Sequence, residues 1–282
     1  MNAVAKKAPK RRLDAELVRR KIARSREAAV DMIKAGRVEV GGFVASKPAT
    51  AVTGDVSIRV SGLEEDENWA SRGAHKLLGA LEAFEPQGLD VKGRKVLDAG
   101  ASTGGFTDVC LRRDVETVYA VDVGYGQLIW RLQDDPRVVV LDRTNVRTLT
   151  PEILGGTADV MVGDLSFISL KLVLPAIVSC LDDGADLLPM VKPQFEVGKE
   201  RLGSGGVVRS DALRQEVVQE VAEYARTLGL SFRAAVASPL PGPSGNVEFF
   251  LWLVKDGGAS DIGDEAMAAA IAKAVEEGPH NG

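Results

Sequence analysis

The chain has 282 residues, which is enough for one or two domains. Its 45% apolar and 27% charged residues are typical of a globular protein, and they exclude a disordered, collagen-like or disulfide-scaffold chain. The formal net charge is −5, from 35 Lys and Arg against 40 Asp and Glu, and taken whole this balance argues against a nucleic-acid partner.

The first part of the chain is basic and the remainder is acidic. The first fifty residues hold 13 Lys and Arg and five Asp and Glu, a net charge of +8, whereas the rest of the chain carries −13. Such a split indicates a basic module joined to an acidic body. The pattern predicts a helix over 13–22, a second helix capped by Ser25 and ended by Gly36, and short strands at 38–40, 43–45 and 56–60.

The acidic run 64–68 is the predicted linker, and it divides the chain into domains at 1–62 and 71–282 with a connection over 63–70. A helix begins at Ser71, and apolar strands then alternate with helices, a pattern typical of an α/β fold with a parallel sheet covered on both faces. The predicted strands are 95–99, 117–123, 137–141, 158–163, 186–191, 231–237 and 246–254, and the predicted late helices are 211–228 and 265–275.

The cysteines and the apolar runs indicate the compartment. Cys110 and Cys180 are the only cysteines, and their spacing is not that of a metal site. A disulfide between them is the alternative, but two thiols in a chain of this length fit a reducing cytoplasm better. No apolar stretch follows the basic N-terminus, and the longest one, 172–181, is about half the length that spans a bilayer. We therefore expect a soluble, cytoplasmic protein without a metal and without a membrane partner.

A glycine-rich turn follows the strand 95–99. It is not a phosphate-binding P-loop, because no Lys-Ser/Thr follows, and its glycine spacing is not the dinucleotide pattern G-x-G-x-x-G. Instead, an acid, Asp98, precedes Gly100 by two, and a second acid, Asp122, closes the next strand. This combination resembles the class I S-adenosylmethionine-dependent methyltransferases. The resemblance implies S-adenosylmethionine as cofactor, with Asp122 on its ribose and the end of the third strand beside its adenine. The implied cofactor residues are Asp98, Gly100, Ala101, Ser102, Thr103, Gly104, Asp122 and Asp142.

The residues after the fourth strand bear on the methyl acceptor. They lack the Asn/Asp-Pro-Pro-aromatic signature of enzymes that methylate base nitrogens, and neither cysteine stands where cytosine carbon methylation needs a nucleophile. A hydroxyl group therefore remains as the methyl acceptor. Asp164 and Lys192 end the fourth and fifth strands, Glu248 lies in the last strand and Lys76 on the helix that enters the domain. In the usual strand order of this fold, the seventh strand lies beside the fifth, so these four side chains can converge. A single charged residue is more often a surface charge, and it is the convergence that favours a site.

This Lys–Asp–Lys–Glu set is similar to the tetrad of RNA 2′-O-ribose methyltransferases. The resemblance implies Lys192 as the base, because desolvation beside a second cation favours a neutral amine, with Lys76, Asp164 and Glu248 in support. The motifs together resemble the TlyA, or hemolysin A, family over about residues 12–280; they are 71–76, 100–106, 164–169, 191–196 and 241–248. Membership implies a class I methyltransferase domain with a seven-stranded, mostly parallel sheet, and methylation of cytidine ribose in 16S and 23S ribosomal RNA by a chain that we expect to be monomeric.

Residues 12–62 resemble the RNA-binding module named for ribosomal protein S4, a small α+β domain. The alternative is a solvated basic helix face, but Arg predominates and few acids intervene, which suits phosphate contacts. The single aromatic residue, Phe43, predicts recognition of backbone and shape instead of stacked bases. The expected RNA contacts are Arg12, Arg19, Arg20, Arg24, Arg26, Lys34 and Arg37.

Two other functions compete with methylation. The hemolysin name suggests a membrane-lytic protein, but the sequence has no basic amphipathic helix with an aromatic face. An RNA-binding assembly factor with a degenerate body is the other alternative, and the intact glycine turn and complete tetrad argue against it.

Overall fold

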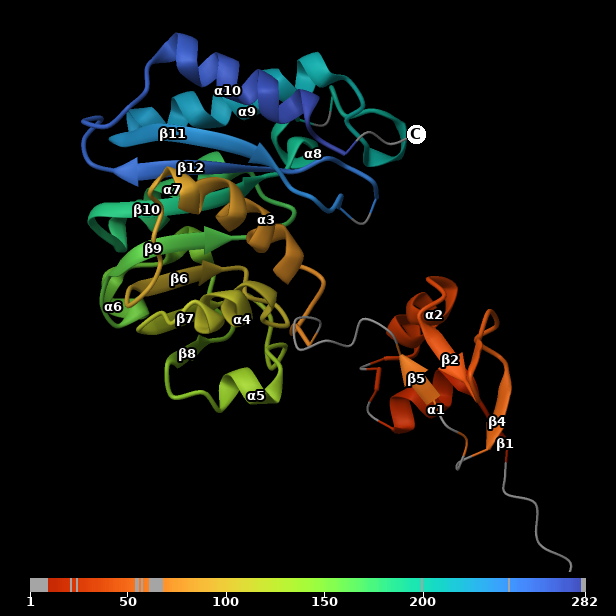
Figure 1. Ribbon diagram of the computed structural model, residues 1–282. Helices are drawn as coiled ribbons and strands as arrows, with labels where there is room; N and C mark the ends of the chain where they lie inside the picture. Colours follow the sequence, from red (N-terminus) through yellow and green to blue (C-terminus); the bar gives the residue numbers. More distant parts are fainter. Residues whose placement is uncertain are drawn as a thin grey trace, which may run out of the picture. The chain divides into compact units, whose positions relative to one another are not determined.

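A computed structural model of the protein describes residues 10–279 except 21, 24, 54, 55, 57, 61–67, 199 and 243. The chain divides into two compact units, Met1–Asn68 and Trp69–Gly282 (Figure 1). The domain boundaries expected at 62 and 71 stay a prediction, because most of the linker lies outside the described residues.

The first unit packs two helices against short antiparallel strands. β2 is central between β3 and β5, and β1 pairs with β4. Ser25 Oγ accepts a hydrogen bond from the amide of Ala28, so the second helix begins at the expected cap. The first helix ends at Arg19, three residues before the predicted end. The elements are β1 (Lys10–Arg12), α1 (Leu13–Arg19), α2 (Arg26–Lys34), β2 (Val38–Val40), β3 (Phe43–Val44), β4 (Ala51–Thr53) and β5 (Ile58–Val60).

The second unit is built on a seven-stranded sheet with the order β11-β12-β10-β9-β6-β7-β8. β12 runs antiparallel to both of its neighbours, while the pairs from β10 to β8 are parallel. The predicted fold class and the expected place of the seventh strand beside the fifth are confirmed. The strands are β6 (Lys95–Ala99), β7 (Thr117–Val121), β8 (Val138–Leu141), β9 (Ala158–Gly163), β10 (Leu181–Val191), β11 (Leu230–Ala237) and β12 (Phe249–Lys255).

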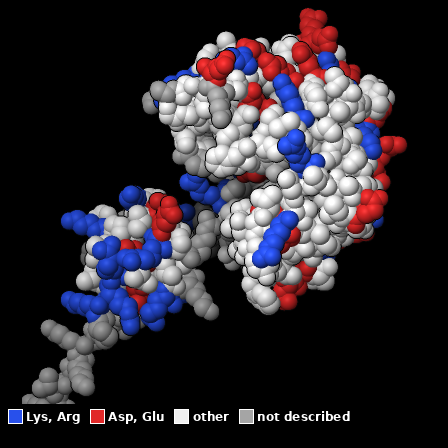
Figure 2. All heavy atoms as spheres, turned by 180° about the vertical axis from the view of Figure 1, so that it is seen from behind, with Lys and Arg blue, Asp and Glu red and all other residues white. Residues whose placement is uncertain are grey.

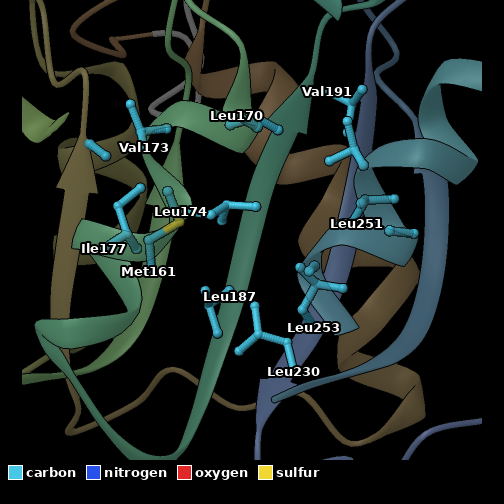
Figure 3. Close-up of a cluster of buried hydrophobic side chains, with 14 of the residues drawn as sticks. Met161, Leu170, Val173, Leu174, Ile177, Leu187, Val191, Leu230, Leu251 and Leu253 are labelled. Atoms are coloured by element: carbon cyan, nitrogen blue, oxygen red, sulfur yellow. The ribbon is translucent and has the colours of Figure 1, made fainter. Parts of the chain in front are cut away.

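Helices cover both faces of this sheet (Figure 1). Neighbouring strand residues point to opposite faces, so Val96 packs with α3 and α4, whereas Leu97 packs with α7, α9 and α10. Figure 3 shows part of the hydrophobic cluster that contains Leu97. It includes Leu187 and Leu251 from the sheet and Leu174 from α7. The helices are α3 (Ala74–Phe84), α4 (Gly105–Arg112), α5 (Trp130–Gln133), α6 (Pro151–Leu154), α7 (Leu174–Ser179), α8 (Pro193–Glu196), α9 (Asp211–Thr227) and α10 (Asp264–Glu276), with short 3₁₀ turns η2 (Glu85–Gln87), η3 (Val146–Thr148), η4 (Leu170–Leu172) and η5 (Ser204–Gly206).

The sheet brings the ends of several strands together at one edge. The carboxyl ends of β6, β7, β9 and β10 open on the same side, which is where α/β sheets bind ligands. Cys110 and Cys180 are both unpaired and buried in the interior. Among the described residues, no helix combines the length and the apolarity needed to cross a membrane.

Candidate active site

Two residues of the predicted tetrad follow neighbouring parallel strands. Gly163 of β9 is in register with Pro189 of β10, so the residues just beyond these strands meet at the edge of the sheet. Lys192 Nζ lies 2.5 Å from Asp164 Oδ1 and donates a hydrogen bond of 2.8 Å to Ser166 Oγ. The lysine is buried and the aspartate is partly exposed. The two strand ends thus hold a cation directly beside a carboxylate.

The other two tetrad residues complete a row of alternating charges. Lys76, on α3, donates from Nζ to Glu248 Oε2 at 2.6 Å, and the same nitrogen lies 3.6 Å from Asp164 Oδ2. The order is therefore Glu248, Lys76, Asp164 and Lys192, with opposite charges adjacent throughout. Glu248 and Lys76 are buried, and a buried charge is tolerated where an opposite charge and hydrogen bonds compensate its lost hydration. The four side chains meet as the sequence predicts.

An open pocket of about 260 Å³ adjoins this row. Lys76 and Asp164 contribute to its wall, and the glycine turn forms the opposite part through four of the expected cofactor residues. The lining residues are Ser71, Arg72, Gly73, Lys76, Gly100, Ala101, Ser102, Thr103, Gly105, Phe106, Asp164, Leu240 and Pro241. The other predicted site residues, Asp98, Gly104, Asp122, Asp142, Lys192 and Glu248, lie outside this lining.

The turn needs glycine for two physical reasons. Gly100 has a φ of 89°, in the left-handed region, and a Cβ there would lie 3.0 Å from the carbonyl oxygen of Asp164. A Cβ on Gly105 would lie 2.3 Å from Ser71 Oγ and 2.9 Å from the amide of Ala74. The start of α4 is therefore packed directly against the turn that begins α3, and this close approach shapes the pocket.

The two acids after β7 and β8 receive backbone amides. Asp122 accepts from the amides of Ser102 at 2.9 Å and Gly124 at 2.7 Å, and Asp142 accepts from Gly126 at 2.8 Å. A carboxylate oxygen with one such bond has a further lone pair. Both acids can thus still accept hydroxyl or amino donors.

Asp98 has a different environment from these two acids. It is fully buried, and Thr107 Oγ1 donates to its Oδ2 at 2.6 Å, while Oδ1 has no hydrogen-bond partner among the described residues. Burial raises the pKa of this carboxyl to about 7. Asp98 lies beneath the glycine turn and faces α4.

Several residues that line the pocket were not predicted as site residues from the sequence. Arg72 is the clearest, because it stands in the 71–76 motif and lines the wall as an exposed cation. Leu240 and Pro241 belong to a proline-rich turn that packs on α3, where a Cβ at Gly79 would lie 2.7 Å from Pro239. The motif was the available signal for Arg72, but nothing in the sequence showed that the turn reaches α3.

Two phenylalanines lie next to the tetrad loops. Phe167 has a φ of 63° and is 90% exposed, which is unusual for a large apolar side chain. Its ring centroid is 5.1 Å from that of Phe195, on α8. An exposed aromatic face therefore lies in the loop that also carries Asp164 and Ser166.

Basic side chains gather on the first unit (Figure 2). Four of the arginines expected to contact RNA are paired with two buried acids of α1: Arg12 and Arg26 with Asp14, and Arg19 and Arg20 with Glu16. Of the other expected contacts, Lys34 is exposed, Arg37 is partly buried, and Arg24 lies outside the described residues.

Comparisons with known proteins agree with this architecture. The FtsJ-like methyltransferase family matches residues 69–255, and the S4 domain family matches residues 11–58. The chain is 54% identical over 268 residues to the 16S/23S rRNA (cytidine-2′-O)-methyltransferase TlyA of Mycobacterium tuberculosis, covering 95% of this chain and 98% of that one. It is 32% identical over 193 residues to the 23S rRNA (cytidine-2′-O)-methyltransferase TlyA of Campylobacter jejuni, covering 67% and 72%.

A solved structure extends the agreement to three dimensions. A protein named as a hemolysin from Streptococcus thermophilus superposes with a TM-score of 0.73 at 35% identity, over 95% of this chain and 97% of that one. The matches reach across both units, and they include the segments that carry the tetrad and the glycine turn. The chain therefore belongs to the TlyA family of FtsJ-like methyltransferases, with an S4 domain ahead of the methyltransferase domain.

Proposed function

We propose that the protein transfers a methyl group from S-adenosylmethionine to the 2′-hydroxyl of cytidine in 16S and 23S ribosomal RNA. The observation that carries the proposal is the row Glu248, Lys76, Asp164 and Lys192 beside the glycine-lined pocket. A ribose hydroxyl is a weak acid, so its oxygen needs a base at hydrogen-bonding distance as it attacks. The row offers two amines in a sheltered position, next to the glycine-lined pocket of about 260 Å³.

The residues around the pocket suit this cofactor. Gly100 carries no Cβ, so the turn Gly100–Thr103 packs closely against the Asp164 carbonyl and its backbone forms part of the pocket wall. Asp122 and Asp142 retain lone pairs for the ribose hydroxyls and the adenine side of the cofactor. Asp98 acts indirectly in this proposal, since it supports the turn through Thr107. When bound, the cofactor supplies an electrophilic methyl group on a positively charged sulfur.

The tetrad then has separate tasks. Lys192 would pass its own proton to solvent and then take the proton of the 2′-hydroxyl, while the bound cofactor would supply the methyl group to that oxygen. The resulting ammonium is stabilised by Asp164, 2.5 Å away, and oriented by Ser166. Lys76, held by Glu248, places positive charge near the developing negative charge on the attacking oxygen. Positioning of the two reactants supplies much of the rate.

The first unit provides affinity for RNA in this proposal. Its arginines suit phosphate contacts, which fix register and orientation without reading sequence. The relative named for both 16S and 23S RNA matches nearly the whole chain, S4 domain included, and this favours both subunits as substrates. We infer that residues 63–70 link the two domains and that the protein acts in the cytoplasm, where ribosomal RNA is found, as a monomer.

The test is mass mapping of 16S and 23S RNA after incubation with the protein and S-adenosylmethionine. We expect one added methyl per modified cytidine, on the ribose. The variant Lys192→Ala is expected to lower single-turnover methyl transfer by about 10²- to 10⁴-fold, the usual contribution of a general base, with cofactor and RNA affinity retained. Methylation on a base, or a Lys192→Ala variant as active as the parent, would contradict the assignment.

A further inference from the structure

Helix α1 buries two carboxylates on a unit that is otherwise rich in positive charge. Asp14 is 2% exposed and Glu16 is 0% exposed. Acidic side chains are almost never this buried unless they are paired. Both lie on α1, a helix of seven residues, and both contact arginines of the basic cluster. A surface that only needed positive charge would have no use for them.

Each carboxylate holds two arginines. Asp14 accepts from Arg12 at 2.7 Å and from Arg26 at 3.3 Å. Glu16 accepts from Arg19 through both oxygens, at 2.6 and 2.8 Å, and from Arg20 at 2.8 Å. These bonds lower the pKa of both carboxyls to about 2. Both acids therefore stay ionised at any physiological pH, and the four guanidinium groups stay anchored.

Three of the four anchored arginines still face solvent. Arg20 does not, because its Nη1 and Nη2 donate to the backbone carbonyls of Val56 and Thr53 and its side chain is only 21% exposed. Arg12 and Arg19 each use Nε and Nη2 toward the carboxylate, so the Nη1 edge is left outside the pair. The side chains of Arg12, Arg19 and Arg26 are 53%, 49% and 61% exposed. A guanidinium has five N–H donors in a rigid fork, so it can bind a buried carboxylate on one edge and a phosphate on another.

Holding the arginines in place has an energetic consequence for binding. A free arginine loses rotamer entropy when it binds a phosphate, which weakens the complex. An arginine that is already fixed by a buried carboxylate has lost that freedom on folding. The same carboxylate, however, removes one unit of positive charge. Fixing the arginines raises RNA affinity, whereas the negative charge of the carboxylate lowers it. A variant that removes only the charge of the carboxylate therefore shows which of the two effects is larger.

We propose that Asp14 and Glu16 are positioning residues for RNA binding: Asp14 presents Arg12 and Arg26, and Glu16 presents Arg19, to phosphates of the ribosomal RNA backbone. This inference rests on the proposed function, since it takes ribosomal RNA as the partner of the first unit. It predicts that RNA affinity falls when either acid loses its charge, although the protein then becomes more positive.

The experiment compares Glu16→Gln with Glu27→Gln in the full chain. Both changes remove one negative charge from the same unit, but Glu27 is exposed whereas Glu16 is buried. The probe is transcribed 16S rRNA, with dissociation constants measured by filter binding across a series of salt concentrations. We expect Glu16→Gln to weaken binding about five- to tenfold and to reduce the salt slope by about one phosphate contact. Glu27→Gln is expected to bind slightly more tightly, with the slope kept.

Four further measurements distinguish the possible outcomes. Melting curves and cofactor affinity verify that Glu16→Gln stays folded, and Asp14→Asn repeats the test on the other pair. In an Arg19→Ala, Arg20→Ala background, Glu16→Gln is expected to have no further effect, because no arginine is left to position. A Glu16→Gln variant that binds as tightly as Glu27→Gln overturns the inference. A parent protein that does not bind 16S rRNA overturns the proposed function instead.

Discussion

Gly242 offers a way to disturb the tetrad without changing any of its members. A Cβ at this position would lie 2.6 Å from Glu248 Oε1. An ordinary carbon–oxygen contact is about 3.4 Å, so Gly242→Ala must push the carboxylate away by about 0.8 Å. The φ of Gly242 is not in the left-handed region, so alanine fits the backbone and the clash is the only direct effect.

The displacement is large enough to break one hydrogen bond. Lys76 Nζ lies 2.6 Å from Glu248 Oε2, and moving the carboxylate by about 0.8 Å lengthens this contact to at most about 3.4 Å. A misplacement near 1 Å in a catalytic arrangement costs up to about 10²-fold in rate. We therefore expect kcat of Gly242→Ala to fall about 30- to 100-fold, with the cofactor dissociation constant unchanged. Overpacking costs about 1–3 kcal/mol, which keeps the variant folded at assay temperature.

The assay is single-turnover transfer of a radiolabelled methyl group to ribosomal RNA, together with a melting curve. Glu248→Asp is the matched control, because its shorter side chain vacates the space that the new methyl group needs. It is expected to lose activity by itself, and adding Gly242→Ala to it should cost little more. Full kcat in Gly242→Ala, or losses from the two changes that multiply as independent effects, would contradict the predicted clash with Glu248.

Two other predictions concern the glycine turn and its support. Gly105→Ala places a Cβ 2.3 Å from Ser71 Oγ, so we expect calorimetry to show at least tenfold weaker binding of S-adenosylmethionine. The double variant Gly105→Ala, Ser71→Gly should recover part of the lost affinity. Unchanged affinity in the single variant would show that the first turns of α3 and α4 move apart freely. Asp98 has a pKa of about 7 in the folded protein against an ordinary value of 3.8, so the unfolded chain ionises first and stability is lost as pH rises from about 4 to about 7. The melting temperature should fall over this range, and Asp98→Asn should flatten the profile; a variant with the parent's slope would mean that another group titrates.

The sheet was predictable because its strands are continuous apolar runs bounded by glycine turns. The predicted ranges 95–99 and 158–163 coincide with β6 and β9. β10 begins at Leu181, five residues before the predicted start, because exposed polar residues occupy its first part and remove the apolar signal. β1 is exposed along its whole length, and its pairing with β4 depends on a partner about forty residues away, so local pattern could not reveal it.

The tetrad was predictable for a topological reason, and its internal order was not. Residues after neighbouring parallel strands must meet, which placed Asp164 beside Lys192 from the sequence alone. Which lysine pairs with Glu248 depends on how the turn after β11 packs on α3 through Pro239. The contact of Ser166 with Lys192 depends on the loop of Phe167, whose left-handed backbone no propensity predicts.

The proposed function requires one chain to bind a cationic cofactor and an anionic RNA, and the charges of the two units suit these two tasks. The tetrad is a neutral row, so it neither attracts nor repels an RNA strand at long range. The acid surplus of the remainder of the chain, including Asp122 and Asp142 beside the pocket, favours a cofactor with a positive sulfur. The same surplus opposes phosphate, so attraction for RNA has to come from the first fifty residues with their net charge of +8. Added salt should then weaken the hold on RNA far more than the hold on the cofactor, because only the first depends on many screened contacts.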